Sequence, residues 1–217
     1  MSKRRVAILI SGRGSNMAAL IDAAKQDDYP AKIVLVISNN PDAAGLMRAR
    51  QADVPTAIVD HKPYGRDRAA FEQSLTSELA AREVELICLG GFMRLFTAGF
   101  VARWQGRMLN IHPSLLPAFK GLDPHGQALA AGVKISGATV HFVVPETDSG
   151  PIIAQTAVPV RDDDTAATLA ARVLAAEHRL YPLALKLVAE DRVRLLEGRC
   201  VIEGARVADA ALYNPSN

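Results

Sequence analysis

Short apolar runs alternate with helix-like segments along the first half of the chain. The apolar runs lie at residues 6–10, 33–38, 56–60, 86–90 and 107–111. Helix-like segments separate them at residues 16–24, 43–52 and 67–82. In the last of these, Phe71, Leu75 and Leu79 are spaced four apart, which places them on one face of a helix. Because the runs are continuously apolar and are joined by helices, they predict a parallel sheet that is buried on both faces.

The second half of the chain has a different pattern. Two extended stretches follow at residues 138–144 and 152–160, and Pro159 in the second indicates an edge strand. Two short strand-like runs come after residue 192. The polar end at residues 214–217 is expected to fray.

A long helix is predicted from about Thr165, with Asp164 or Thr165 as its N-terminal cap. Its apolar stripe steps by three and four residues and comprises Leu169, Val173, Ala176, Leu180 and Leu183. We expect Pro182 to kink or loosen this helix, because proline removes a backbone N–H donor.

These elements predict an α/β fold. A Rossmann-like, mostly parallel sheet flanked by helices is joined to a smaller mixed C-terminal half. We expect a single domain over residues 1–217, divided into a Rossmann-like half at 1–100 and a second half at 101–217.

Composition and charge exclude several classes of function. The 217 residues are 49% hydrophobic and carry a net charge of +2, spread evenly along the chain, which does not favour nucleic-acid binding. No apolar run approaches the length of a membrane span, and the apolar run after the basic residues 3–5 is too short for a signal peptide. Cys88 and Cys200 lack metal or redox spacing, and Cys88 lies in an apolar run. We expect a reduced, cytoplasmic protein.

Polar clusters follow three of the apolar runs, at Ser11–Asn16, Gly90–Arg94 and Asn110–His112. Open α/β sheets bind ligands outside the carboxyl ends of their strands, which is where these clusters are expected to lie. Their convergence is the first indication of an enzyme.

The first cluster, SGRGSN, offers glycines and a helix N-terminus, which together suit a phosphate. A dinucleotide site is excluded, because Met17 stands where the third glycine is needed and residues 38–40 lack the acidic residue. Two interpretations remain. The loop binds a single phosphate with Ser15 and Asn16 as donors, or it is a tight turn capped by one of these side chains.

Asn110 and His112 lie two residues apart, just before Pro113. On an extended strand such residues point to the same side. An amide can donate a hydrogen bond to an oxyanion, and an imidazole can exchange a proton near neutral pH. The pair therefore suits a tetrahedral intermediate. The alternative is a histidine satisfied by the backbone at the end of a strand, with Asn110 as a turn residue.

Asp148 lies in the turn sequence ETDSGP. Aspartates in turns commonly cap their own backbone. A catalytic role requires Asp148 to fold back beside His112, where it would stabilise the imidazolium. The spacing in the sequence leaves both interpretations open.

Taken together, these segments resemble the phosphoribosylglycinamide formyltransferase family, folate-dependent enzymes of purine biosynthesis. The resemblance covers nearly the whole chain. It is carried, in order, by ISGRGSN, GGFMRLF, LNIHPSLLP, HFVVPETDSGPII and AAEHRLYP. The resemblance implies the formyltransferase fold, 10-formyltetrahydrofolate as co-substrate and no metal.

The resemblance also implies a role for individual residues. The catalytic residues would be Asn110, His112 and Asp148. The residues that bind the phosphoribosylglycinamide would be Gly14, Ser15, Asn16 and Glu177. The residues that contact the folate would be Arg68, Met93, Arg94, Leu95, Phe96 and Asn110. The resemblance also implies that residues 1–100 form the phosphate-binding half and residues 101–217 the catalytic and folate-binding half.

Several positions depart from the family pattern. Phe96 stands where an aliphatic residue of the folate wall is usual, Ser149 where a glycine is usual, and Asp123 and Pro124 where other polar residues are usual. His125 follows them in a loop and could assist substrate binding. None of the implied catalytic residues is missing.

Two other functions remain open. A 10-formyltetrahydrofolate hydrolase would use the same site, but in that family an N-terminal regulatory domain precedes it. A non-catalytic module that binds a phosphorylated metabolite would have no use for the Asn110 and His112 pair. A tRNA formyltransferase would need a further C-terminal domain.

We expect small-molecule substrates, no nucleic acid, no membrane, and a monomer or weak homodimer.

Overall fold

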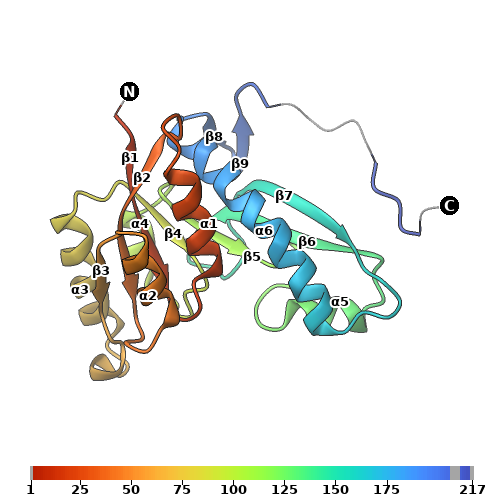
Figure 1. Ribbon diagram of the computed structural model, residues 1–217, viewed down its shortest axis with the longest axis horizontal. Coiled ribbons are helices and arrows are strands. Elements are labelled where there is room, and N and C mark those ends of the chain that lie inside the picture. The colour runs from red at the N-terminus through yellow and green to blue at the C-terminus, as the bar shows by residue number, and fades with distance from the viewer. Residues whose placement is uncertain (1, 206–210, 216–217) are drawn as a thin grey trace. The chain divides into compact units, whose positions relative to one another are not determined.

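The computed structural model describes residues 2–205 and 211–215. The chain forms two compact units. The first comprises the residues up to Asn110 together with Phe142–Pro145, and the second comprises Ile111–His141 and the residues from Glu146 onward. The hydrogen-bonded strand order is β3-β2-β1-β4-β5-β6-β7, with β8 and β9 forming a separate pair (Figure 1).

The strands of the first unit are parallel, as predicted. They are β1 (Arg4–Ile10), β2 (Ala31–Ser38), β3 (Thr56–Ile58), β4 (Leu86–Leu89) and β5 (Met108–His112). Strand β1 pairs with β2 and β4, while β3 and β5 join the outer sides of these two. The residues from Val6 to Ile10 are completely buried, which explains the absence of polar alternation in the run.

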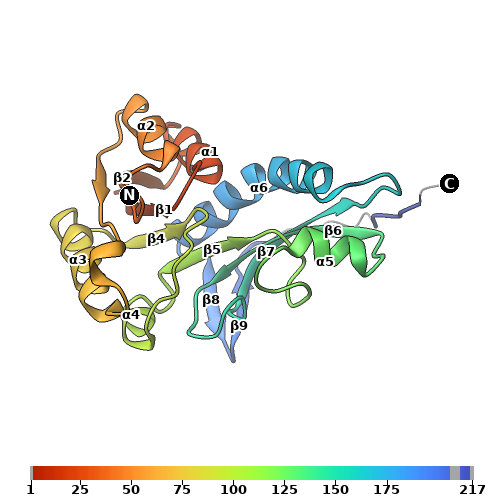
Figure 2. The ribbon, with the colours of Figure 1, turned by 90° about the horizontal axis from the view of Figure 1, so that it is seen from below.

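Helices cover both faces of this sheet. Helices α1 (Ser15–Ala24) and α2 (Ala44–Gln51) lie on one face, and α3 (Arg68–Ala81) and α4 (Ala98–Arg103) lie on the other (Figure 2). A short 3₁₀ turn, η1 (Lys62–Tyr64), precedes α3. The expected face of α3 is buried. Helix α4 was not predicted, because six residues are too few to show a helical period.

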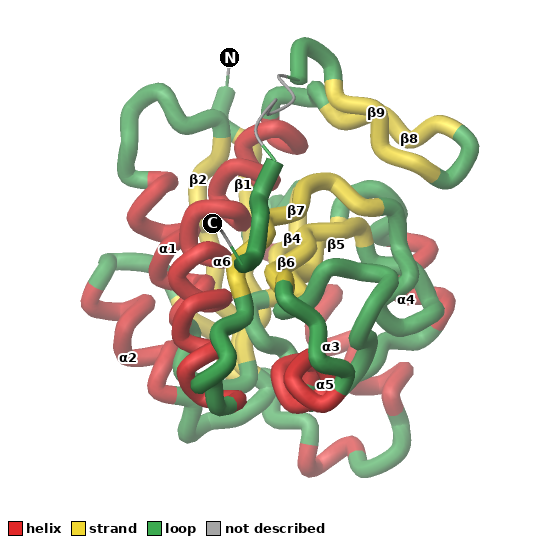
Figure 3. Tube along the Cα trace, turned by 90° about the vertical axis from the view of Figure 1, so that its right-hand side faces the viewer, coloured by secondary structure: helices red, strands yellow, loops and turns green. Residues whose placement is uncertain are grey.

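The second unit contains α5 (Pro124–Ala130), β6 (Ile135–Phe142), β7 (Ile152–Pro159), α6 (Ala166–Ala189), β8 (Val193–Leu196) and β9 (Arg199–Ile202). Strands β6 and β7 pair antiparallel, and β7 ends the strand order, which confirms the edge strand expected from Pro159. The two strand-like runs after residue 192 are confirmed as the β8–β9 hairpin (Figure 3).

Helix α6 begins with the predicted cap at Thr165, in a capping box with Thr168. The helix continues through Pro182 to Ala189, so the proline at which a kink or loosening was expected does not end it. Residues Tyr181, Ala184 and Leu185 around the proline are completely buried, so tertiary packing stabilises the turn whose hydrogen bond proline removes. Leu183, expected in the apolar stripe, is half exposed.

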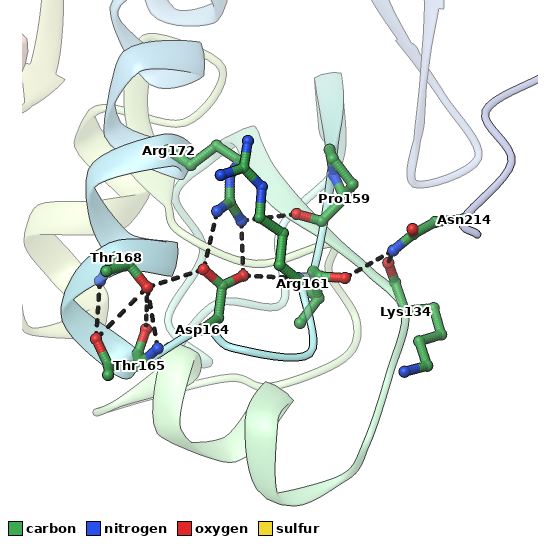
Figure 4. Close-up of polar contacts among 9 residues, drawn as sticks. Lys134, Pro159, Arg161, Asp164, Thr165, Thr168, Arg172 and Asn214 are labelled. Atoms are coloured by element: carbon green, nitrogen blue, oxygen red, sulfur yellow. Dashed lines mark hydrogen bonds and ion pairs between the residues drawn. The ribbon is translucent and has the colours of Figure 1, made fainter. Parts of the chain in front are cut away.

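The polar end of the chain was expected to fray from residue 214, and residues 216 and 217 lie outside the described part. Asn214 is held in place. Its side-chain amide donates to the carbonyl oxygens of Lys134 and Val160, at 2.5 and 2.7 Å (Figure 4).

Candidate active site

The glycine loop leads directly into α1 in the first unit. Gly14 occupies the N-cap position with left-handed dihedral angles, φ 67° and ψ 35°. The alternative in which Ser15 or Asn16 occupies the cap was therefore wrong, since both residues lie within the helix. Because the first N–H groups of a helix lack partners inside it, this end of α1 suits an anion.

Close backbone packing holds the glycine loop against α2. The N–H of Gly45 donates to the carbonyl oxygen of Gly12 at 3.0 Å. A Cβ atom on Gly45 would lie 2.5 Å from Cδ1 of Ile10, so only glycine fits there without a shift. The loop is thus a constrained turn whose shape does not depend on side-chain caps.

The segment from Gly91 to Phe96 follows β4 without regular secondary structure. Met93 and Leu95 are 65% and 60% exposed, although both are large and apolar. Phe96 is partly buried and stacks between Phe92 and Phe100, with ring centroids 5.4 and 4.7 Å away. The segment therefore combines a fixed aromatic base with exposed apolar side chains, which suits a planar organic ligand.

Strand β5 carries both Asn110 and His112. Asn110 is paired with Leu89 of β4 and is partly exposed, and it is the last residue of this part of the first unit. His112 is buried and belongs to the second unit. The strand continues through His112, as the interpretation of the pair requires.

Asp148 folds back beside His112 in the second unit. Its Oδ2 atom lies 3.3 Å from Nδ1 of His112, and the two side chains are only 10% and 7% exposed. The same oxygen accepts a hydrogen bond from the N–H of Gly121 at 2.9 Å. Nε2 of His112 lies 2.8 Å from the carbonyl oxygen of Phe119. Both ring nitrogens thus face oxygen acceptors, an arrangement that satisfies a doubly protonated imidazolium.

A second histidine contacts the same carboxylate. Nε2 of His141, on β6, lies 3.8 Å from Oδ1 of Asp148. His141 is only 2% exposed. Its position on the strand could be read from the sequence, but the return of the Asp148 turn to that strand could not.

Polar side chains on β6 and β7 hold the loop that follows His112. The Thr139 hydroxyl accepts from the N–H of Leu116 at 3.0 Å and donates to the carbonyl oxygen of Ser114 at 2.7 Å. The Gln155 amide donates to the carbonyl oxygen of Leu116 at 2.9 Å. Sequence reasoning missed both residues, because a buried threonine on a strand carries no signal of its partners.

The remaining predicted residues differ in their exposure to solvent. Arg68 is exposed at the start of α3, and Arg94 is partly exposed. Glu177 is among the buried residues of α6 and is 5% exposed. His125 lies in α5, and burial lowers the pKa of its imidazole. Its Nδ1 atom has no hydrogen-bond partner among the described residues.

The described residues contain neither a cluster of metal ligands nor a membrane-spanning helix. No group of three or more His, Cys, Asp or Glu side chains within residues 2–205 and 211–215 is arranged to hold a metal ion. No helix in the same ranges is long and apolar enough to cross a membrane.

The chain belongs to the formyl transferase family, whose model matches residues 4–185. It is 39% identical to the phosphoribosylglycinamide formyltransferase of Haemophilus influenzae, over 97% of this chain and 99% of that protein. It is 51% identical to the trifunctional purine biosynthetic protein adenosine-3 of Bos taurus, over 90% of this chain. The chain covers only 19% of that protein's length.

Solved structures share the fold. The glycinamide ribonucleotide transformylase 1 of Symbiobacterium toebii superposes with a TM-score of 0.89 at 46% identity, covering 93% of this chain and 94% of that one. A formyltetrahydrofolate deformylase from Pseudomonas syringae superposes with a TM-score of 0.86 at 27% identity, covering 93% of this chain and 66% of that one. The predicted formyltransferase fold is thus confirmed.

Proposed function

We propose that this chain transfers the formyl group of 10-formyltetrahydrofolate to the amine of 5-phosphoribosylglycinamide, in purine biosynthesis. The products are formylglycinamide ribonucleotide and tetrahydrofolate. The observation that carries the proposal is the buried contact between His112 and Asp148. His112 lies two residues after Asn110 on the same strand. Membership of the formyl transferase family and the names of the full-length relatives support it.

The reaction is acyl transfer without a covalent enzyme intermediate. The glycinamide amine attacks the formyl carbon, and the carbonyl oxygen becomes an oxyanion. The Asn110 amide and the His112 imidazolium donate hydrogen bonds to this oxyanion. The bond from carbon to the folate nitrogen then breaks, the amine loses a proton, and the folate nitrogen gains one with the help of His112.

Asp148 holds the imidazole through Nδ1, which leaves Nε2 for the substrate. Nε2 lies 2.8 Å from the carbonyl oxygen of Phe119 in the structure, so the oxyanion takes the place of this acceptor when substrate binds. The charge of Asp148 favours the imidazolium over the neutral ring while the oxyanion is present.

The substrate-binding residues remain proposals from the family resemblance. Gly14, Ser15 and Asn16 bind the phosphate at the N-terminus of α1, and Glu177 binds the glycinamide amine. The residues that bind the folate are Arg68, Met93, Arg94, Leu95, Phe96 and Asn110. The exposed side chains of Met93 and Leu95 support this assignment. Cytoplasmic location and a monomeric or weakly dimeric state stay predictions.

An absorbance assay tests the proposal. The purified chain is mixed with a 10-formyl folate analogue, and deformylation is followed with and without phosphoribosylglycinamide. We expect product only when the amine is present. Binding of the phosphorylated amine without any turnover would instead indicate a non-catalytic module.

A hydrolase is the second candidate, because the Pseudomonas syringae deformylase shares the fold over 93% of this chain. In a hydrolase, water replaces the amine as nucleophile at the same His112 and Asp148 pair. Equal rates of deformylation with and without the amine would establish this activity in place of transfer.

A further inference from the structure

Ser11 is the first residue of the glycine loop, but its hydroxyl forms a hydrogen bond with the segment from Gly91 to Phe96. Its Oγ atom accepts a hydrogen bond at 2.8 Å from the N–H of Met93, in the segment that follows β4. The N–H of Ser11 donates to the carbonyl oxygen of Gly91 at 3.2 Å. Two hydrogen bonds thus join the end of β1 to the first residues of that segment.

Asn39 fixes the direction of the Ser11 hydroxyl. Ser11 donates its single O–H to Oδ1 of Asn39 at 2.6 Å, so only its lone pairs remain for Met93. Asn39 is 3% exposed, and its amide nitrogen lies 3.1 Å from Nδ1 of His61. The hydroxyl is therefore an oriented acceptor before any ligand binds.

The side chains of Met93 and Leu95 do not fix the backbone between the stacked rings of Phe92 and Phe96, because both are mostly exposed. The far end of the segment is fixed separately. The buried carboxylate of Glu72 accepts from the N–H of Thr97 at 2.6 Å and from its hydroxyl. The backbone that carries the exposed apolar side chains is therefore held at both ends, at Met93 by Ser11 and at Thr97 by Glu72.

We propose that Ser11 is a positioning residue for the formyl donor. Its hydroxyl fixes the backbone at Met93, so that Met93, Arg94 and Leu95 are already ordered when the folate binds. This inference rests on the proposed function, which assigns these three side chains to the folate. A loop that is already ordered loses less conformational freedom on binding, and this lowers the cost of association.

The test compares Ser11→Ala with wild type in steady-state kinetics and in equilibrium binding of a 10-formyl folate analogue. Losing one such hydrogen bond is expected to raise the KM and Kd for the folate roughly 3- to 10-fold. We expect kcat, and the KM for phosphoribosylglycinamide, to change less than about 2-fold, and Ser11→Thr to restore folate binding. Folate Kd and KM within about 2-fold of wild type in Ser11→Ala would overturn the inference.

Ser74→Ala is the matched control. Like Ser11→Ala, this substitution removes a partly buried hydroxyl in the first unit. The Ser74 hydroxyl forms hydrogen bonds with Tyr64 and with the Ala70 carbonyl oxygen, which lie outside the glycine loop and the segment from Gly91 to Phe96. It should leave the folate KM unchanged. If Ser74→Ala raised the folate KM as much as Ser11→Ala, the effect would be general destabilisation and the inference would fail.

Hydrogen exchange at the Met93 amide tests the contact in the wild-type protein, without folate or a variant. The amide belongs to an exposed residue outside regular structure, so slow exchange requires the Ser11 acceptor. Fast exchange in the wild type would overturn the inference even if Ser11→Ala did not fold. A wild-type protein that binds no folate but protects Met93 would refute the proposed function while leaving the contact established.

Discussion

Nδ1 of His112 lies 3.3 Å from Oδ2 of Asp148, although the two residues come from a strand and a distant turn. Asp148 adopts a left-handed conformation with φ 48°, which costs a non-glycine residue on the order of 1 kcal/mol. The hydrogen bond from the N–H of Gly121 and the contact with His112 help to offset this cost. The carboxylate is thus oriented before substrate arrives, as general acid–base catalysis requires.

Replacing Asp148 by asparagine should reduce turnover roughly 100-fold or more, because a neutral amide cannot stabilise the imidazolium of His112. The amide oxygen of asparagine can still accept from Gly121, so we expect the loop to keep its position. Steady-state kinetics of formyl transfer measure the effect.

Asp162→Asn serves as the control for Asp148→Asn. Asp162 also lies in the second unit, but its side chain is 91% exposed and pairs with Lys134 at the surface. This control should retain wild-type turnover. An Asp148→Asn variant as active as this control would remove Asp148 from the mechanism.

Gly45→Ala should destabilise the first unit and weaken phosphate binding. The new methyl group would lie 2.5 Å from Cδ1 of Ile10 and 3.1 Å from the carbonyl oxygen of Gly12, so the buried Ile10 side chain or the backbone of α2 must shift. Such overpacking typically costs about 1–3 kcal/mol. Denaturant unfolding measures the stability, and titration with phosphoribosylglycinamide measures the binding.

Gly12→Ala is the matched control in the same loop. A Cβ atom there would meet no described atom within 4 Å. We expect its free energy of unfolding to stay within about 0.5 kcal/mol of wild type. Equal losses of stability in the two variants would show that the loop does not depend on the close approach of Gly45.

Asp164 should contribute to stability in a pH-dependent manner. A bidentate ion pair with Arg172 at 2.7 and 2.8 Å, together with hydrogen bonds from Arg161 and Thr168, holds the pKa of this carboxyl far below its ordinary value (Figure 4). A lowered folded-state pKa stabilises the protein above the unfolded-state pKa of about 4, and this contribution is lost as the pH falls below it.

The difference in unfolding free energy between wild type and Asp164→Asn measures this contribution. It should be constant from about pH 8 to pH 5 and should shrink as the pH falls below about 4. The exposed neighbour Asp163 provides the control, since Asp163→Asn should change the unfolding free energy by less than about 0.5 kcal/mol. A difference for Asp164→Asn that grew on acidification would contradict the assignment.

The sequence predicted the parallel strands well, because strands buried on both faces form continuous apolar runs. It predicted neither α4 nor α5, whose six and seven residues span fewer than two turns of a helical period each. It predicted a kink or loosening at Pro182 from a local rule, and the structure shows that α6 continues through this residue. Periodicity therefore identifies long elements, and tertiary contacts decide the exceptions.

The sequence offered candidate residues for the site but not the contacts between them. The spacing of Asn110 and His112 on one strand was readable, since strand geometry fixes where neighbouring side chains point. The return of Asp148 to His112 depends on a turn, and turn sequences do not encode which distant side chain they meet. The contacts of His141 and Ser11 were not predicted either, because their partners are distant in the sequence.

The most direct test of the central claim is the rate of formyl transfer by His112→Ala, measured as the amine-dependent deformylation of a 10-formyl folate analogue. Folate affinity is measured on the same preparation. The proposed mechanism predicts a rate roughly 100-fold or more below wild type, with folate affinity nearly unchanged. A variant that transfers the formyl group at close to the wild-type rate would contradict the assignment of His112 as the catalytic imidazole.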